Sequence, residues 1–491
     1  MSPEPANLSI VVIGASGDLA LKKILPAFFA LYCQDLLPPR VNIFGFARSK
    51  FTDEEFRHHA EKRLTCRYTP GVACADRTRE FLERCFYVQG SYDSKESFLD
   101  LYETMKRVEG GAPANRLFFM AIPPGVVLDA ARALGNSGLI GCEQREPWSR
   151  VVIEKPFGRD RESSDLLARS LADFLPEERT CRIDHYLGKE MIQNLVVLRF
   201  ANLVFETVWN KNFIRNVQIC WKEDIGVEER GGYFDSYGII RDVMQNHILQ
   251  ILALVAMEPP VRFNADHVRD EKVKVLRSIP ALKLEDVVLG QYVGSRNSAR
   301  AFPAYVEEPT VARDSVTPTF AAAVLKINTA RWLGVPFYLS AGKGLDSRMT
   351  EIRIQFKEVP NNMFCEIGGC PATNELVIRI QPDEAIGLKI VNKVPGLDLT
   401  LEARDLDLHY RTAFSRQIPE AYENLLLDVI KGDKSLFIRN DELEAAWDIF
   451  TPVLHEIDRL RVKPEPYPFL SRGPVAANNL AAKYGVACES A

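Results

Sequence analysis

The first 180 residues alternate between short β-rich runs and helical segments, and this alternation constrains the fold more than any other feature of the chain. Such alternation is typical of a parallel sheet with helices on both faces. We therefore expect residues 1–185 to form an α/β domain, built as a Rossmann-like, doubly wound parallel sheet. The expected buried strands are Leu8–Ile13, Val41–Phe46, Phe86–Val88, Arg116–Ile122 and Val151–Ile153.

After about residue 200 the pattern changes to a period of two, which marks strands with one covered face. With 491 residues the chain is too long for one core, so a second domain is expected. We predict that residues 186–491 form an α+β domain with a large, mainly antiparallel sheet and helices, and that about the last twenty residues are a mobile tail. The alternating triplets are Val217/Ile219/Trp221, Ile352/Ile354/Phe356, Leu376/Ile378/Ile380 and Leu397/Leu399/Leu401, and the expected helices are Gly238–Met257 and Asp441–Leu460.

The net charge of the chain is −5, so its overall field does not attract nucleic acid. No uninterrupted apolar run is long enough to span a bilayer, so no membrane partner is expected. The ten cysteines form no CxxC pair and no zinc-like spacing. Scattered free thiols fit a reducing compartment better than a disulfide framework, and we expect a cytoplasmic protein.

The segment Gly14–Ala20, GASGDLA, follows the first expected strand and opens the first helix. Gly14 permits a tight turn, and Gly17 lets backbone N–H groups approach a pyrophosphate at the helix N-terminus. The spacing is not the usual GxGxxG, so a purely structural turn remains an alternative. The residues that we expect at a dinucleotide here are Gly14, Ala15, Ser16, Gly17, Asp18, Leu19 and Lys23.

The second expected strand ends in Arg48 and Ser49, where enzymes that use NAD usually carry a carboxylate for the ribose 2′-hydroxyl. A guanidinium suits a 2′-phosphate, because it offers a rigid fork of donors to an anion. This end of the strand favours NADP over NAD. The alternative is that Arg48 is a solvated loop residue.

Lys155 stands in a Glu-Lys-Pro run at the end of the expected strand Val151–Ile153. This places Lys155 at the carboxyl edge of the sheet, where open α/β sheets bind their ligands. Pro156 restricts Lys155 to an extended backbone. A surface lysine beside a turn proline is the alternative interpretation.

The run Arg182–Glu190, RIDHYLGKE, combines donors with an acid. Asp184 can cap the turn that follows it. His185, Tyr186 and Lys189 are three or four residues apart, so a helical turn brings them together. Imidazole, phenol and ammonium offer several donors to a phosphate. The alternative interpretation is an ordinary helix start. That interpretation accounts for any one of these residues, but it accounts less well for all of them together.

His247 begins an apolar helical stretch after Arg241–Asn246. A histidine at the edge of a buried helix is more often a hydrogen-bonded core residue than a base, so both interpretations stay open. Asp242 is five residues away, about 140° around an α-helix. The carboxylate that orients His247 is therefore expected from elsewhere in the chain.

Together these runs resemble the glucose-6-phosphate dehydrogenase family, and the similarity covers most of the chain, from Gly14 to about Pro452. The motifs GASGDLA, FARS, EKPFG, RIDHYLGKE, RGGYFD, RDVMQNH, AGK and IFTP occur in family order. RIDHYLGKE is the most specific of them. The resemblance implies oxidation of β-D-glucose 6-phosphate to the 6-phosphoglucono-lactone with reduction of NADP+, the first step of the oxidative pentose phosphate pathway.

The resemblance also implies roles for single residues. His247 is the general base, and Asp184 is its orienting carboxylate. Lys155 bridges substrate and cofactor, and no metal is needed, because a base and a hydride acceptor suffice. The substrate residues implied in this way are Lys155, His185, Tyr186, Lys189, Glu223, Asp242, Lys343, Arg348 and Gln381.

Some positions depart from the family pattern. Leu21 stands where many members have Lys, and Val127 where the animal enzymes have a tyrosine. Some members bind a second, structural NADP. Here Met349 and Gly387 replace a Lys and a Tyr of that site, so a tight second site is not expected, although Arg353, Arg379 and Lys389 resemble parts of it.

Two other functions remain as alternatives. One is a different NADP-dependent sugar oxidoreductase of the glucose–fructose oxidoreductase type, a class that lacks RIDHYLGKE. The other is a non-catalytic sugar-phosphate sensor, which could lose the base while keeping the phosphate cradle. The family resemblance further implies a homodimer or homotetramer, with a face of the broad sheet as a possible subunit interface.

Overall fold

The computed structural model describes residues 7–68, 71–140, 147–296, 301–368 and 370–487. The chain divides into two compact units, and each is described by itself. The first unit comprises Met1–Lys189, Arg262–Arg269 and Gln417–Leu443, and the second comprises Glu190–Val261, Asp270–Arg416 and Glu444–Ala491.

The first unit is built on a six-stranded sheet in which every neighbouring pair is parallel. The strand order is β3-β2-β1-β4-β5-β6, the order of a doubly wound dinucleotide-binding sheet. The predicted parallel α/β fold is confirmed. The strands are β1 (Asn7–Ile13), β2 (Val41–Ala47), β3 (Cys85–Gln89), β4 (Ala114–Met120), β5 (Ser149–Glu154) and β6 (Thr180–Ile183).

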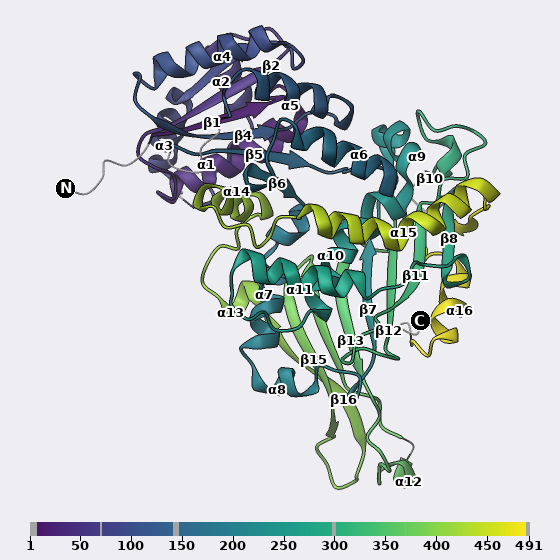
Figure 1. Ribbon diagram of the computed structural model, residues 1–491. Helices are drawn as coiled ribbons and strands as arrows, with labels where there is room; N and C mark the ends of the chain where they lie inside the picture. Colours follow the sequence, from purple (N-terminus) through teal and green to yellow (C-terminus); the bar gives the residue numbers. More distant parts are fainter. Residues whose placement is uncertain (1–6, 69–70, 141–146, 297–300, 369, 488–491) are drawn as a thin grey trace. The chain divides into compact units, whose positions relative to one another are not determined.

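Helices connect these strands, and one helix comes from far along the chain. α14 packs against α1 (Figure 1), and its residues Leu425, Leu426 and Val429 join the hydrophobic core of this unit. The helical elements are η1 (Ala20–Ile24, a π-helix), α1 (Leu25–Cys33), α2 (Asp53–Glu61), α3 (Val72–Glu83), α4 (Lys95–Val108), η2 (Pro124–Val126), α5 (Val127–Asn136), α6 (Arg161–Ala172), η3 (Glu177–Arg179), η4 (His185–Gly188) and α14 (Ala421–Lys431).

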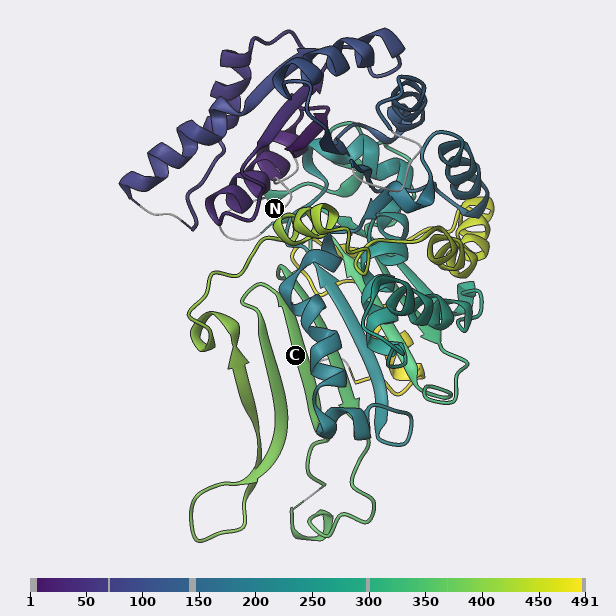
Figure 2. The same cartoon turned by 60° about the vertical axis from the view of Figure 1, so that its left-hand side comes forward.

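The second unit is built on a nine-stranded sheet of order β16-β15-β14-β13-β7-β12-β11-β8-β17. Its pairs are antiparallel except β7–β12 and β8–β17, which confirms the predicted large, mainly antiparallel sheet. β16 forms one edge (Figure 2). The strands are β7 (Ile214–Lys222), β8 (Val287–Val293), β11 (Phe320–Lys326), β12 (Pro336–Gly342), β13 (Met349–Phe356), β14 (Glu375–Gln381), β15 (Ala385–Lys393), β16 (Leu401–His409) and β17 (Glu465–Pro468), with a separate pair β9 (Ser295–Arg296) and β10 (Ala301–Phe302).

The longest helical stretch of the second unit runs from Glu228 to Ala256. Its length and composition would allow it to cross a membrane, but 83% of its apolar window is buried, as in the core helix of a folded domain. It consists of η5 (Glu228–Arg230), α9 (Gly231–Ile239), η6 (Ile240–Ile248, a π-helix) and α10 (Leu249–Ala256), with a kink at Gly238, whose φ is 70°.

The remaining helices of the second unit are short, and two helices have residues in both units. The helices are α7 (Glu190–Phe200), α8 (Leu203–Val208), η7 (Leu284–Asp286), η8 (Tyr305–Glu307), α12 (Cys365–Gly368), α13 (Tyr410–Ala413) and α16 (Val475–Lys483), and those shared by the two units are α11 (Ala265–Arg277) and α15 (Asn440–Leu460).

Two expectations for the second half are wrong. Leu397 and Leu399 lie before β16, where Leu397 is fully exposed, so their alternation marks a loop and only Leu401 is in the strand. The last twenty residues are not simply a mobile tail, because Val475–Lys483 form α16. Ala477 and Ala481 of this helix are buried. The small residues of the segment suggested a mobile tail, but here they allow the helix to pack closely.

The expectation of free thiols is also wrong for four cysteines. Cys66 is bonded to Cys74, and Cys365 to Cys370, and the members of each pair are close in sequence, 8 and 5 positions apart. Cys85, Cys181 and Cys220 are free, and Cys142 and Cys488 lie outside the described residues. The cysteine pattern therefore no longer supports a reducing compartment.

Candidate active site

The glycine loop between β1 and η1 makes a close backbone approach. Gly14 has a φ of 89°, and a Cβ there would overlap the carbonyl oxygen of Ala121. The Gly14 N–H donates to the Phe46 carbonyl at 2.7 Å, and the Gly17 N–H donates to the Gly14 carbonyl at 2.9 Å. The loop thus has the glycine-dependent geometry that a dinucleotide pyrophosphate requires, and it fits this group.

The end of β2 lies against this loop. The Ser49 hydroxyl donates to the Ser16 hydroxyl at 3.0 Å. Arg48 is exposed just after the strand, with its guanidinium 5.3 Å from the centre of the Tyr92 ring. A guanidinium supported by a ring face and open to solvent is suited to bind a phosphate. The structure therefore brings Ser16 and Ser49, two residues that the sequence predicts at the cofactor, into contact.

The first turns of the helix after the loop carry the other predicted cofactor residues. Ala15 is buried, whereas Asp18 is exposed and pairs with Lys22 at 2.7 Å. Lys23 is exposed and lies 3.4 Å from a carboxylate oxygen of Glu420. Lys23 thus forms an ion pair with Glu420, which also belongs to the first unit. Leu19 directly precedes the π-helix η1.

Lys155 directly follows β5, as the sequence predicts, and its bond to Pro156 is cis. Glu154, the last residue of the strand, accepts a 2.8 Å hydrogen bond from the Tyr422 hydroxyl. Burial raises the pKa of the Glu154 carboxyl to about 7, although the Tyr422 hydroxyl and the Lys155 ammonium act in the opposite direction. The carboxyl edge of the sheet thus carries a lysine beside an acid that titrates near neutrality.

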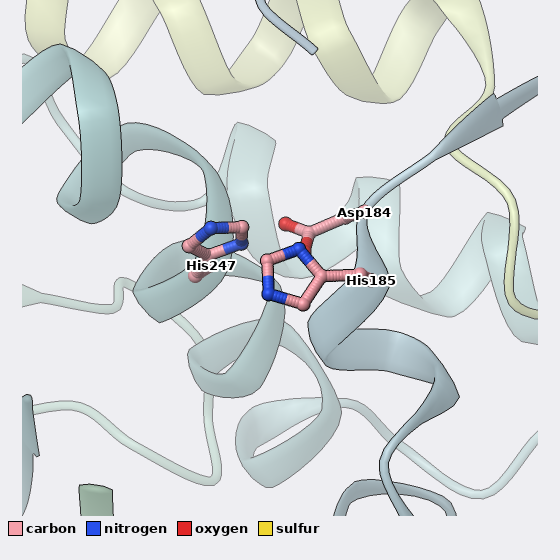
Figure 3. Close-up of side chains that lie close together, drawn as sticks. All are labelled: Asp184, His185 and His247. Carbon is pink, nitrogen blue, oxygen red and sulfur yellow. The ribbon is translucent and has the colours of Figure 1, made fainter. Parts of the chain in front are cut away.

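Asp184 directly follows β6 and is 1% exposed (Figure 3). Its side chain caps the next turn by accepting the Tyr186 N–H at 2.9 Å, as predicted. The turn η4 is a 3₁₀-helix, in which residues three apart lie above one another. Lys189 accordingly places its ammonium 4.8 Å from the centre of the Tyr186 ring. The ring of His185 lies 5.1 Å from that of Tyr186, so the turn does group the three predicted donors.

In the second unit, Glu223 and Lys343 form an ion pair with an N···O distance of 2.5 Å. They follow β7 and β12, which are neighbouring parallel strands and therefore end at the same edge of the sheet. Two rings flank the Lys343 ammonium, with centres 5.4 Å away for Trp221 and 5.6 Å for Phe234. The Tyr467 hydroxyl donates to the Lys343 carbonyl at 2.6 Å. The position of Lys343 is therefore fixed at both its main chain and its ammonium.

Arg348 and Gln381 lie at the same edge of this sheet. β13 runs antiparallel to β7, and Met349 pairs with Lys222, so Arg348 comes just before the strand at the end of β7. β14 runs antiparallel to β13, and Gln381 pairs with Thr350. The register thus gathers all four sheet residues that the family resemblance assigns to the substrate.

His247 lies on η6 and is 3% exposed (Figure 3), and its backbone N–H donates to the Asn246 side-chain oxygen at 2.7 Å. η6 is a π-helix, whose hydrogen bonds join residues five apart. From the sequence, Asp242 and His247 are expected to lie about 140° apart around an α-helix. This expectation is wrong, because in the π-helix the two residues are about one turn apart. A π-helical segment inside a longer helix is frequent at functional sites.

The basic residues that resemble a second nucleotide site are largely paired with acids. Arg353 binds the carboxylates of Glu351 and Glu375, and Lys389 lies 3.7 Å from a Glu375 oxygen. Arg353 and Lys389, two of the three residues that resemble this site, thus have acidic partners within the sheet.

Sequence reasoning missed the parts played by Trp221, Phe234 and Tyr422. The first two stand near recognised motifs, but a ring that faces an ammonium carries no local signature. Tyr422 lies more than 230 residues after the turn that it contacts. Only the return of α14 to the first unit brings it there.

Comparison with known proteins agrees with this geometry. Residues 11–194 match the family model described as glucose-6-phosphate dehydrogenase, NAD binding domain, and residues 196–489 match the C-terminal domain of the same family. The chain is 54% identical to chloroplastic glucose-6-phosphate 1-dehydrogenase 1 of Arabidopsis thaliana, over 98% of this chain and 83% of the relative. It is 48% identical to cytoplasmic glucose-6-phosphate 1-dehydrogenase 5 of the same plant, over 98% and 92% of the two chains.

A solved structure described as glucose-6-phosphate dehydrogenase in complex with its substrate glucose-6-phosphate is similar over the whole of both chains. Its TM-score is 0.92 and its sequence identity is 41%. A glucose-6-phosphate 1-dehydrogenase from Mycobacterium avium matches with a TM-score of 0.84 and 32% identity over 99% of each chain. The chain belongs to the glucose-6-phosphate dehydrogenase family.

Proposed function

We propose that the chain oxidises glucose 6-phosphate at C1 to 6-phosphoglucono-1,5-lactone, with His247 as the general base and Asp184 as the carboxylate that orients it. The imidazole of His247 would take the C1-hydroxyl proton, and bound NADP+ would supply the acceptor for the C1 hydride. The observation that carries this proposal is the RIDHYLGKE segment, in which one 3₁₀ turn groups His185, Tyr186 and Lys189 directly after the buried Asp184.

The phosphate of the substrate suits the donors of this turn, because an imidazole, a phenol and an ammonium all donate to its oxygens. We assign the sugar hydroxyls to Glu223 and Asp242, as polar acceptors. The residues assigned as further substrate contacts are Lys155, Lys343, Arg348 and Gln381.

NADP supplies the hydride acceptor when it is bound. We assign its pyrophosphate to the loop Gly14–Gly17 and the start of the next helix, and its 2′-phosphate to Arg48 and Ser49. In this proposal residues 1–185 serve as the NADP-binding domain, and residues 186–491 serve substrate binding and oligomerisation.

Exchange of His247 for Asn tests the base. Asn keeps the size and a hydrogen-bonding side chain but accepts no proton, so kcat is expected to fall by a factor of about 10² to 10⁴, with little change in the KM for glucose 6-phosphate. NADPH absorbance measures the rate, with unphosphorylated glucose and NAD+ as reference substrates. His58→Asn is the matched control, because His58 is exposed on α2 of the first unit.

Near-normal turnover of H247N would remove His247 from the role of base. The same assay separates the alternative functions. A non-catalytic sensor would bind glucose 6-phosphate without forming NADPH, and an oxidoreductase of another substrate class would not prefer the phosphorylated sugar.

We also propose that the enzyme is a homo-oligomer that uses the face of β15 and β16 on which Leu406 and Leu408 lie. Leu406 and Leu408 of the edge strand are 59% and 41% exposed, and they pair with Leu388 and Ile386 of β15. An exposed apolar row at a sheet edge is suited to a second copy of the same chain. Leu406→Lys is expected to give monomers in analytical ultracentrifugation. A parent protein that is itself monomeric would contradict the proposal.

For the location we propose the cytoplasm, which matches the cytoplasmic relatives from Arabidopsis, whereas other relatives are chloroplastic. Fluorescence microscopy of the tagged full chain in its own cells tests this location.

A further inference from the structure

Tyr422 contacts two parts of the candidate site at once, although nothing in the preceding assignment gives it a role. Its hydroxyl donates to Oε1 of Glu154 at 2.8 Å. Its ring lies nearly parallel to the imidazole of His185, with ring centres 6.2 Å apart and 10° between the planes. One side chain thus links the end of β5 to the turn that follows β6.

The neighbours of Tyr422 hold it rigidly in this position. Asn424 donates from its side-chain amide to the Gly188 carbonyl at 3.0 Å, which fixes α14 on the turn η4. Leu425 and Leu426 are fully buried in the core of the first unit. Glu423 accepts from the Tyr68 hydroxyl at 2.6 Å on another side of the helix. Tyr422 therefore has a fixed support that a surface tyrosine lacks.

The two ends of Tyr422 have distinct chemistry. Burial and the nearby Glu154 carboxylate raise the pKa of the Tyr422 phenol far above its ordinary value, so it remains a donor at any physiological pH. The charged groups that act on Glu154 are Lys155 and Asp184, in addition to this hydroxyl. Loss of the hydroxyl would leave a largely buried carboxyl without this donor.

We propose that Tyr422 is a positioning residue for the substrate site: its ring holds the imidazole of His185 in the plane that binds the substrate phosphate, and its hydroxyl holds Glu154 and thereby the adjoining Lys155. The first half of this inference rests on the proposed function of His185. The second half rests on Lys155 as the bridge between substrate and cofactor.

Two variants separate the two halves. Tyr422→Leu removes both the ring and the hydroxyl, and Tyr422→Phe removes the hydroxyl alone. The KM for glucose 6-phosphate is expected to be about three- to tenfold higher in Tyr422→Leu than in Tyr422→Phe. This is the range expected when one aromatic pair is lost. With unphosphorylated glucose the two variants are expected to have equal KM values, because that substrate has no phosphate for His185 to bind.

Tyr422→Phe itself is expected to lower kcat about tenfold for both sugars, because its effect acts through Glu154 and Lys155 and not through the phosphate. Glu154→Leu, whose side chain has no oxygen to accept from a Tyr422 hydroxyl, is expected to reproduce this loss. It should add little in the double variant, because both changes remove the same hydrogen bond.

Tyr68→Phe and Tyr68→Leu are the matched controls. They make the same chemical changes at a tyrosine whose hydroxyl binds Glu423 of the same helix and not Glu154. Thermal unfolding of all four tyrosine variants shows whether α14 stays packed. A loss of activity that follows only the drop in melting temperature, in the Tyr68 and Tyr422 series alike, would overturn the positioning role.

His185→Ala, measured in parallel, distinguishes failure of this inference from failure of the proposed function. If H185A weakens glucose 6-phosphate alone, whereas Y422L and Y422F have the same KM, the ring of Tyr422 has no positioning role. If H185A affects both sugars equally, the phosphate assignment of His185 is wrong, and the first half of the inference fails with it. A normal kcat in Y422F overturns the second half.

Discussion

At the scale of single residues, cofactor choice depends on Arg48. Sequence alone placed this guanidinium at the end of the second strand, and the structure adds its support on Tyr92 and the bond between Ser49 and Ser16. We predict that Arg48→Ala raises the KM for NADP+ at least tenfold and changes the KM for NAD+ far less. The reason is that only NADP+ carries the 2′-phosphate with which a guanidinium forms charge-assisted hydrogen bonds.

Initial rates over a range of each cofactor, with glucose 6-phosphate saturating, measure the effect of Arg48→Ala. Arg132→Ala serves as the control, because Arg132 is exposed on α5 of the same unit. Equal changes in KM for both cofactors would remove the 2′-phosphate role.

The candidate site was predictable residue by residue to a limited degree. Asp184 could be recognised as a cap from its place before a turn, and this capping is present. The pairing of Glu223 with Lys343 could not be deduced, because it depends on β7 and β12 lying side by side in parallel within a mainly antiparallel sheet. Local sequence carries no information about which distant strand becomes a neighbour.

At the scale of elements, the contact between η4 and α14 decides where the phosphate donors lie. A Cβ on Gly188 would overlap the carbonyl oxygen of Ala421 and come within 2.9 Å of the Leu425 side chain. We predict that Gly188→Ala pushes α14 away from the turn, lowers the free energy of unfolding by about 1–3 kcal/mol and raises the KM for glucose 6-phosphate.

Thermal unfolding and substrate kinetics of the purified variant measure both effects of Gly188→Ala. Gly125→Ala is the control, because Gly125 in η2 has open space at the Cβ position and an ordinary φ. That change is expected to be neutral or slightly stabilising. A Gly188→Ala protein with the parent's melting temperature would show that α14 adjusts without cost.

Strands were predicted well where their residues alternate, or where they belong to the regular alternation of strand and helix in the first half, as β1 and β2 do. β13 and β14 lie where their alternating residues predicted strands. β11, with the sequence FAAAVLK, was missed because six of its seven residues are buried, so no alternation appears. A strand covered on both faces cannot be told from a buried helix by periodicity alone.

At the scale of the whole molecule, the sequence predicted two sheets of different kinds but not how the chain divides between them. Local patterns fix secondary structure. The return of Gln417–Leu443 to the first unit, however, is decided by packing of residues such as Leu425 and Phe437 into a core formed mostly by the first 190 residues. This return also brings buried acids into the first unit, and these make stability depend on pH.

Asp428 on α14 is a partly buried acid of this kind. Burial raises its pKa to about 7, and the carboxylate of Asp433 adds to the shift, while Lys431 opposes it. In the unfolded chain the pKa of an aspartate is about 4. Between these two values the folded state binds a proton that the unfolded state has released, so the free energy of unfolding falls as pH rises from about 4 to about 7. Above pH 7 the full cost of the buried charge remains.

We therefore predict that Asp428→Asn, which has the same shape and no charge, stabilises the protein by about 1 kcal/mol at pH 8, a value reduced from the full shift because the side chain is partly solvated. The gain should shrink as pH approaches 5, because the parent carboxyl is then protonated and uncharged. Melting temperatures of variant and parent at pH 5, 6.5 and 8 measure this difference. Asp100→Asn, at an exposed residue of α4, should show no such trend, and a gain for Asp428→Asn that does not vary with pH would mean that the charge of Asp428 is not its cause.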